Sequence, residues 1–415
     1  MACCDPSCES ALSLDARVYL HDIEKADILV GIPSFNNVLT ASYVLSQVVK
    51  GLDTYFPNMR SVIFVSDGNS TDQTLTSVKK VNLPSAVKLI PAIYMGLSGK
   101  GRAIRAIFEA ASYLKVKSVA LVDSDLRSIT PEWMRLLISP ALAGTGFVAP
   151  YYNRRKYDGT ITNFLCYPVI TSLFGKDIRQ PIGGDFGLSI ELVEDLLASP
   201  MWKHPDVCRF GIDIFETITA VAKDYKIKQA LLGVKNHDAK DPTSQLASMF
   251  RQVMNVMFTC IEQYESVWKE ISGVVPTQMF GEAIYSETPE PIQVSLPATV
   301  QAFKDNYDKH RPIYKSFLDQ EIQNAFEQIK EIENKKVDFS SEIWAKTVYS
   351  FIAEFHKQKA NGREKLLDAL RILWIGRVAV FLKDTWTLSR EECEQLITTE
   401  AKVFQKLKPY LIERY

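Results

Sequence analysis

The chain has 415 residues, of which 47% are hydrophobic and 23% are charged, and its formal net charge at pH 7 is −1. This composition is typical of a globular protein, and the length is sufficient for two domains. The near-neutral charge argues against a nucleic-acid-binding protein, and no uncharged apolar run is long enough to span a membrane. Because the first residues lack the basic start and apolar core of a signal peptide, we expect a cytoplasmic protein.

The first half of the chain alternates between short apolar runs and amphipathic segments. The apolar runs predict strands, and the segments between them predict helices. We expect strands at residues 27–32, 61–66, 87–91 and 118–122, and helices at 38–52, at 99–114 and from Pro131 onward. Repeated strand–helix units predict an α/β fold with a parallel, doubly wound, Rossmann-like sheet.

The second half of the chain is mostly helical. Apolar residues recur every three to four positions through residues 298–335, 340–357, 363–386 and 389–410, which predicts helices there. We therefore expect an N-terminal tail (1–25), an α/β catalytic domain (26–272), a linker (273–297) and a helical region (298–415). We expect the helical region to support a homo-oligomer, either a dimer or a tetramer.

The most informative stretch is Val122-Asp123-Ser124-Asp125, at the end of a predicted buried strand. A strand that ends in two carboxylates places them at the carboxyl edge of the sheet, where open α/β folds bind ligands. Hard oxygen ligands at this edge suit Mg2+ or Mn2+ holding a phosphorylated substrate.

Three other segments border predicted strand ends at the same edge: 33–37, Asp67-Gly68 and Gly99-Lys100-Gly101. A phosphate site needs cations and exposed amides. Lys100 between two glycines fits both needs, because glycine lets the backbone approach a ligand closely. The chain has neither a G-x-x-x-x-G-K-[ST] loop nor a G-x-G-x-x-G after its first strand, which argues against a P-loop and against a typical dinucleotide fold.

Taken in order, these segments resemble the motifs of retaining GT-A glycosyltransferases, which use nucleotide sugars. The resemblance extends to Gln180-Pro181-Ile182-Gly183-Gly184-Asp185, Phe210-Gly211-Ile212-Asp213 and Lys235-Asn236-His237-Asp238, and it covers roughly Asp27 to Glu270. The likeness is strongest to glucosylglycerate and mannosylglycerate synthases and weaker to glucosyl-3-phosphoglycerate synthases. It implies a GT-A type nucleotide-sugar-binding sheet followed by a mostly α-helical C-terminal region.

The resemblance also implies roles for the matching residues on the donor side. Asp125 and His237 would be the metal ligands, joined by Asp123, which would also lie beside the ribose and the donor sugar. A carboxylate–imidazole set suits Mg2+ or Mn2+, with the substrate diphosphate completing the shell. The residues that would bind the nucleotide sugar are Pro33, Phe35, Asn37, Asp67, Gly68, Lys100, Asp123 and Ser124.

On the acceptor side, the implied residues are Arg154, Thr160, Thr162, Gly183 and Gly184. An arginine fork pairs bidentately with a carboxylate such as that of glycerate. Arg155 and Lys156 either add charge that favours a phosphorylated acceptor or form a solvated turn. The implied catalytic residues are Asp213, Asp185 and Lys100.

Two departures from mannosylglycerate synthases leave the donor and the acceptor open. Asp185 stands where those enzymes have Glu, and residues 238–240 replace a basic residue and an aromatic. The implied reaction is metal-dependent, retaining transfer of a hexose, with glucose favoured over mannose, from GDP-glucose, UDP-glucose or GDP-mannose to D-glycerate. That reaction would make a compatible solute of the glucosylglycerate type. The alternatives are 3-phosphoglycerate or another small acceptor, a different sugar or nucleotidyl transferase, and a non-catalytic nucleotide-sugar-binding protein.

Overall fold

The computed structural model describes residues 10–237, 246–282, 289–290 and 294–415, and it divides into two compact units. The first, here called the sheet unit, comprises Met1–Asn153, Arg179–Asp238 and Thr277–Pro289. The second, the helical unit, comprises Arg154–Ile178, Ala239–Pro276 and Glu290–Tyr415. Residues 154–178 and 246–272, which the sequence analysis assigns to the α/β domain, thus group with the C-terminal helices.

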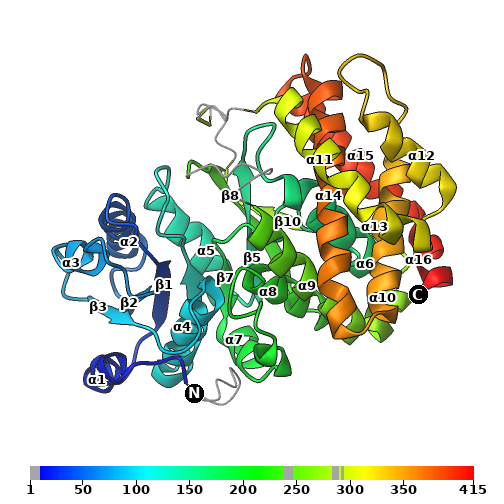
Figure 1. Ribbon diagram of the computed structural model, residues 1–415. Helices are drawn as coiled ribbons and strands as arrows, with labels where there is room; N and C mark the ends of the chain where they lie inside the picture. The colour runs from blue at the N-terminus through cyan, green and yellow to red at the C-terminus, as the bar shows by residue number, and fades with distance from the viewer. Residues whose placement is uncertain (1–9, 238–245, 283–288, 291–293) are drawn as a thin grey trace. The chain divides into compact units, whose positions relative to one another are not determined.

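The sheet unit contains an 8-stranded sheet in the order β10-β8-β5-β7-β4-β1-β2-β3 (Figure 1). The strands are β1 (Ile28–Ser34), β2 (Ser61–Asp67), β3 (Val87–Ile93), β4 (Ser118–Leu121), β5 (Phe147–Asn153), β7 (Gly187–Ser189), β8 (Ile227–Val234) and β10 (Gln278–Phe280). The α/β fold is confirmed, and the four predicted strands, β1 to β4, pair in parallel. The whole sheet is mixed, because β7 runs antiparallel to β4 and β5. β10 lies in the expected linker and pairs in parallel with β8.

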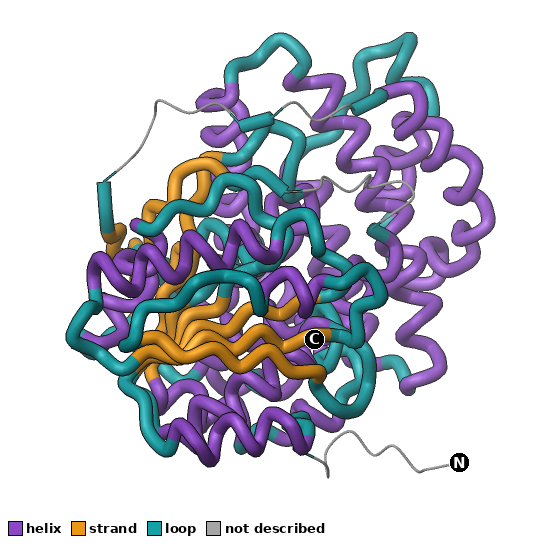
Figure 2. Tube along the Cα trace, turned by 90° about the vertical axis from the view of Figure 1, so that its left-hand side faces the viewer, coloured by secondary structure: helices purple, strands orange, loops and turns teal. Residues whose placement is uncertain are grey.

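Helices cover both faces of this sheet (Figure 2). On one face, α2 (Ala41–Tyr55) and α5 (Glu132–Leu142) share an apolar core with β1 and β2. On the other, α4 (Lys100–Leu114) packs directly on β1, since a Cβ at Gly31 would lie 2.4 Å from the Ile107 side chain. The remaining helices are α1 (Leu14–Ile23), α3 (Thr74–Val78), α7 (Ile190–Leu197), η2 (Pro200–Lys203) and α8 (Ile212–Ala222). The expected N-terminal tail therefore contains a helix, α1.

The helical unit confirms the helical reading of the second half of the chain. Its α-helices are α6 (Tyr167–Phe174), α9 (Ala247–Gln263), α10 (Glu265–Glu270), α11 (Leu296–Phe317), α12 (Gln320–Ile329), α13 (Ser341–Lys357), α14 (Ala360–Thr385), α15 (Arg390–Lys406) and α16 (Lys408–Arg414). A π-helical turn, η1 (Thr162–Cys166), precedes α6, and β6 (Lys176–Asp177) pairs with β9 (Val275–Pro276). The helix predicted over 298–335 is divided near Leu318. Within the described residues, no helix is long and apolar enough to cross a bilayer.

Candidate functional site

The reversed strand β7 explains how two distant aspartates meet. Asp123 follows β4 and Asp185 precedes β7, and the antiparallel pairing brings these strand ends to one edge of the sheet. Leu121 and Phe186 exchange backbone hydrogen bonds, and the backbone N–H of Asp123 donates to Oδ1 of Asp185 at 2.7 Å. Asp185 is fully buried, so its carboxylate is held in place by the sheet itself.

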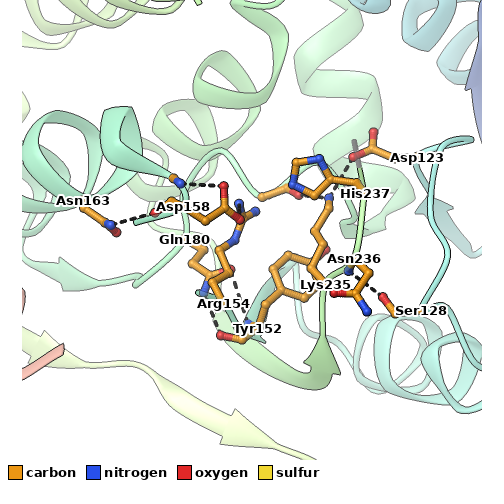
Figure 3. A network of polar contacts seen from close by, with 12 residues as sticks. Asp123, Ser128, Tyr152, Arg154, Asp158, Asn163, Gln180, Lys235, Asn236 and His237 are labelled. Atoms are coloured by element: carbon orange, nitrogen blue, oxygen red, sulfur yellow. Dashed lines mark hydrogen bonds and ion pairs between the residues drawn. The ribbon is translucent and has the colours of Figure 1, made fainter. Parts of the chain in front are cut away.

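Two lysines join three carboxylates at this edge, and Figure 3 shows one of these contacts, between Lys235 and Asp123. The Nζ atom of Lys235 lies 2.9 Å from Asp123 Oδ2 and 2.8 Å from Asp185 Oδ2. The Nζ atom of Lys100 lies 2.9 Å from Asp123 Oδ1 and 3.1 Å from Asp213 Oδ1. Asp213 belongs to the first turn of α8. Both oxygens of Asp123 are therefore paired with ammonium groups. We call these five residues the lysine–aspartate cluster.

Burial and charge act differently on the members of the cluster. Burial raises the pKa of all three aspartates, but Lys100 and Lys235 outweigh it at Asp123 and hold the pKa of that carboxyl far below its usual value. The pKa values of Asp185 and Asp213 stay raised, because burial there exceeds the effect of the lysines. Burial alone would lower the pKa of Lys100, but Asp123 and Asp213 raise it well above normal. Lys100 is therefore charged and Asp123 ionised at neutral pH.

Glu216 is a buried carboxyl one helical turn beyond Asp213 on α8. It is fully buried, and neither of its carboxyl oxygens has a hydrogen-bond partner among the described residues. Burial, followed by the charge of Asp213, raises the pKa of Glu216 well above its usual value. Because an unpaired buried carboxylate is costly, we expect Glu216 to be protonated at neutral pH.

We expect Glu216→Gln to stabilise the protein at pH 7.5, by roughly 2–4 °C in Tm. In the wild type, the unfolded chain releases this proton above about pH 4.3 while the folded chain retains it, so stability falls as pH rises from there towards the raised folded pKa. The glutamine amide of the variant does not titrate, so the variant does not lose stability in this way as the pH rises. Thermal melts between pH 4 and 8 should show the difference shrinking towards pH 4. Glu191→Gln, at an exposed position on α7, is the control. A pH-independent difference would contradict the protonated state.

Hydrogen bonds between two loops bring the segments of Asp125 and His237 together, and Figure 3 shows the one between Asn236 and Ser128. The N–H of Arg127 donates to the Asn236 carbonyl at 2.9 Å, and the Arg127 guanidinium donates to the His237 carbonyl at 3.2 Å. The N–H of Asn236 donates to the Ser128 hydroxyl at 2.8 Å.

This pair suits a divalent cation, because both residues are half-buried and they supply a carboxylate and an imidazole. Across the described part of the chain, no group of three or more His, Cys, Asp or Glu is arranged to hold a metal. Asp125 and His237 would thus provide two ligands, and substrate oxygens would provide the others. Asp123, the third predicted ligand, instead has both oxygens paired with lysines.

The predicted nucleotide loops lie together at the ends of β1 and β2. The N–H of Gly68 donates to the Ser34 carbonyl at 2.8 Å, and the Ser124 hydroxyl donates to Asn37 Oδ1 at 2.8 Å. The Phe35 ring is 57% exposed and lies beside Gly68. An exposed aromatic ring in this position is suited to stacking on a base.

Asp67 and Pro33 have structural roles within these loops. Asp67 is buried, and its Oδ2 accepts hydrogen bonds from the Ser34 and Ser70 hydroxyls, each at 2.7 Å. Its Oδ1 accepts from the Ser70 N–H at 2.7 Å. Pro33 lies within β1, opposite Ser66 of β2. Asp67 therefore orients the loop that carries Gly68.

The glycines beside Lys100 do not offer the free amides that we expected for a phosphate loop. The N–H of Gly99 donates to the Tyr94 hydroxyl at 2.9 Å, and that of Gly101 donates to a backbone carbonyl of segment 207–209 at 3.0 Å. A Cβ on Gly101 would lie 1.8 Å from another carbonyl oxygen of this segment. The glycines thus let segment 207–209 pack on the start of α4, and Lys100 contributes to the site through its side chain.

Gly183 and Gly184 lie directly at the lysine–aspartate cluster. The Gly183 carbonyl accepts a hydrogen bond from Lys235 at 2.8 Å. Gly184 has a φ of +88°, and a Cβ there would lie 2.4 Å from Asp123 Oδ2. Glycine is required at this position, because it adopts the left-handed conformation without strain and leaves room for the carboxylate.

The other three predicted acceptor residues belong to the helical unit. Arg154 Nη1 lies 3.2 Å from Asp158 Oδ2 (Figure 3). Thr160 and Thr162 are buried, and the Thr160 hydroxyl has no hydrogen-bond partner among the described residues. An acceptor carboxylate at Arg154 would share the guanidinium with Asp158.

The sequence analysis did not assign site roles to Lys235, Tyr152 and Glu216. The Tyr152 hydroxyl donates to the Asp185 carboxylate, and its ring centroid lies 5.0 Å from the Lys235 ammonium. A signal was available for Lys235, since a lysine directly after an apolar strand lies at the ligand-binding edge. Tyr152 and Glu216 occur in ordinary strand and helix patterns, which gave no such signal.

Comparisons with known proteins find partial structural similarity. No protein-family model and no curated protein matches the chain. Among solved structures, glucosyl-3-phosphoglycerate synthase from Mycobacterium tuberculosis, in complex with Mn2+, uridine diphosphate and phosphoglyceric acid, is 23% identical with a TM-score of 0.46. That alignment covers 58% of this chain and 82% of the other. The same enzyme with Mn2+, UDP-glucose and glycerol 3-phosphate is 21% identical with a TM-score of 0.44, over 59% of this chain and 84% of the other.

Proposed function

We propose that the protein is a metal-dependent, retaining glycosyltransferase of the GT-A type, which transfers a hexose, preferentially glucose, from a nucleotide sugar to D-glycerate. The principal support is the lysine–aspartate cluster at the carboxyl edge of the sheet, which combines charged lysines with carboxylates of different pKa. Asp125 lies two residues after Asp123, and His237 lies two residues after Lys235. The ion pair between Asp123 and Lys235 therefore connects the two segments that carry the candidate metal ligands.

In the proposed reaction, the bond between the donor anomeric carbon and the diphosphate oxygen breaks, and its electron pair leaves with the diphosphate. The acceptor hydroxyl oxygen bonds to the anomeric carbon with retention, and its proton passes to the leaving phosphate. A divalent cation at Asp125 and His237 would supply positive charge to the diphosphate. Lys100 supplies further positive charge, and we assign Asp185 and Asp213 to the sugar hydroxyls and the positive charge that develops on the sugar.

We favour D-glycerate over 3-phosphoglycerate because of the position of Lys156. Its ammonium donates to three backbone carbonyls at the end of α14. Its ammonium is therefore committed to the protein, so Lys156 follows neither of the two alternatives that the sequence left open for it, a charge for a phosphorylated acceptor or a solvated turn. The homo-oligomer and the cytoplasmic location stay predictions.

A product assay tests the proposed function. Purified protein with Mg2+ or Mn2+ is incubated with UDP-glucose, GDP-glucose or GDP-mannose and with D-glycerate or 3-phosphoglycerate, and the products are examined by NMR. An α-linked glycosylglycerate is expected. Nucleotide release without such a product would reject the acceptor, pyrophosphate release would indicate a nucleotidyltransferase, and binding without turnover would indicate a non-catalytic protein.

Arg154→Ala should raise the acceptor KM by roughly 10-fold or more and leave the donor KM nearly unchanged. The reason is that a guanidinium–carboxylate pair is a strong, charge-assisted contact that the donor does not share. Steady-state kinetics with each substrate varied in turn measures the effect. Arg155→Ala is the matched control at the neighbouring position, and an equal rise in both KM values would reject the acceptor role.

A further inference from the structure

The loop that carries the predicted acceptor residues is anchored on a single helix of the helical unit. The Lys156 ammonium donates to the carbonyl oxygens of Thr385, Trp386 and Leu388 at 2.8, 3.2 and 3.0 Å. The last turn of a helix leaves its carbonyls without intrahelical partners and carries partial negative charge. Lys156 therefore caps the C-terminus of α14, although the two are 229 residues apart in the sequence.

Two further contacts fix the same loop along α14. The Tyr157 ring packs edge-on against Phe381, with centroids 6.1 Å apart, and stacks with Trp386 at 6.5 Å. The Trp374 indole N–H donates to the Thr160 carbonyl at 3.3 Å. Helix positions 374, 381 and 385 are separated by about two turns and then one turn, so they lie on one face of α14. The loop thus contacts α14 along that face and at the C-terminal end of the helix.

The direction of Arg154 depends on the shape of this loop. Asp158 accepts hydrogen bonds from Arg154 at 3.2 Å and from the Gly159 N–H at 2.7 Å (Figure 3). The Asn163 amide donates to the Asp158 carbonyl at 3.0 Å. Because Asp158 connects Arg154 to the loop backbone, a shift of the loop on α14 would move the guanidinium.

We propose that Lys156 and Trp374 are positioning residues for acceptor recognition, which hold residues 154–162 on α14 so that Arg154 meets the acceptor carboxylate. The identity of the acceptor rests on the proposed function, whereas the anchoring of the loop does not. Neither residue contacts the acceptor in this scheme, and both act through Arg154. The C-terminal helices would thus take part in substrate selection.

The test uses Lys156→Met and Trp374→Phe, which keep bulk and remove the anchoring hydrogen bonds. Lys408→Met is the matched control, because the Lys408 ammonium also donates to three backbone carbonyls, elsewhere in the helical unit. Trp268→Phe is the second control, because it loses a similar indole bond to a carbonyl at 3.0 Å. All four proteins are assayed for both KM values, for Tm, and for hydrogen exchange of residues 154–162.

We expect the two loop variants to raise the acceptor KM about tenfold, to leave the donor KM within about twofold, and to speed exchange at residues 154–162. The controls should lower Tm without changing the ratio of the two KM values or the exchange of this loop. Equal changes in both KM values, or unchanged exchange in the loop, would overturn the positioning role. If the wild type transfers no sugar, the proposed function fails, and the exchange rates still decide whether α14 anchors the loop.

Discussion

Lys235→Met should destabilise the protein by about 3–5 kcal/mol and abolish sugar transfer, because it leaves buried negative charge without its partner. Lys235 is 6% exposed, and its ammonium pairs with Asp123 and with the fully buried Asp185. Asp123 keeps Lys100 in the variant, whereas Asp185 has no other ion pair among the described residues. Urea unfolding at pH 7 and a transfer assay measure the two effects. The loss of stability should shrink at low pH, where Asp185 becomes protonated.

Two further variants separate the loss of the charge partner from a general packing defect. Lys226→Met, at an exposed position just before β8, should change stability by less than about 0.5 kcal/mol. The double variant Lys235→Met/Asp185→Asn should regain part of the lost stability, because it removes the uncompensated charge, and should remain inactive. If the double variant is no more stable than Lys235→Met alone, the ion pair is not the cause.

The sequence predicts the edge of the site well, because strand ends are local features. Asp123, Ser124 and Asn37 lie where the strand boundaries place them, and the structure joins their loops through a hydrogen bond. The apolar runs identify β1 and β4 because buried parallel strands need continuous apolar sequence. The order of strands along the chain then brings their carboxyl ends to one edge.

The interior of the site depends on features that local patterns do not contain. β7 has three residues, too few for a periodic signal, yet its reversal is what places Asp185 beside Asp123. The interpretation of Gly101 was wrong because a glycine that permits close approach serves a protein carbonyl as readily as a phosphate. Glu216 lies in a helix that is buried on almost every side, where the pattern favours an apolar residue.

Asp125→Ala and His237→Ala should each reduce metal-dependent kcat by roughly 10²–10³-fold while the fold survives. Both side chains are half-buried, and the hydrogen bonds that join their loops come from the Arg127 and Asn236 backbones and the Arg127 guanidinium, so truncation leaves those bonds in place. Electron paramagnetic resonance of Mn2+ measures metal binding without turnover, and thermal melts report the fold. We expect weaker Mn2+ binding in both variants and a Tm close to that of the wild type.

The control for a general histidine effect is His21→Ala, whose side chain is 85% exposed on α1. It should bind Mn2+ and turn over as the wild type does. The decisive comparison adds the double variant Asp125→Ala/His237→Ala, because two ligands of one ion should lose metal affinity in a non-additive way when both are removed. If Asp125→Ala and His237→Ala both retain near-normal turnover, the metal assignment is rejected. If only His237→Ala retains it, the cation lies with the carboxylates at the end of β4, and the end of β8 contributes Lys235 alone.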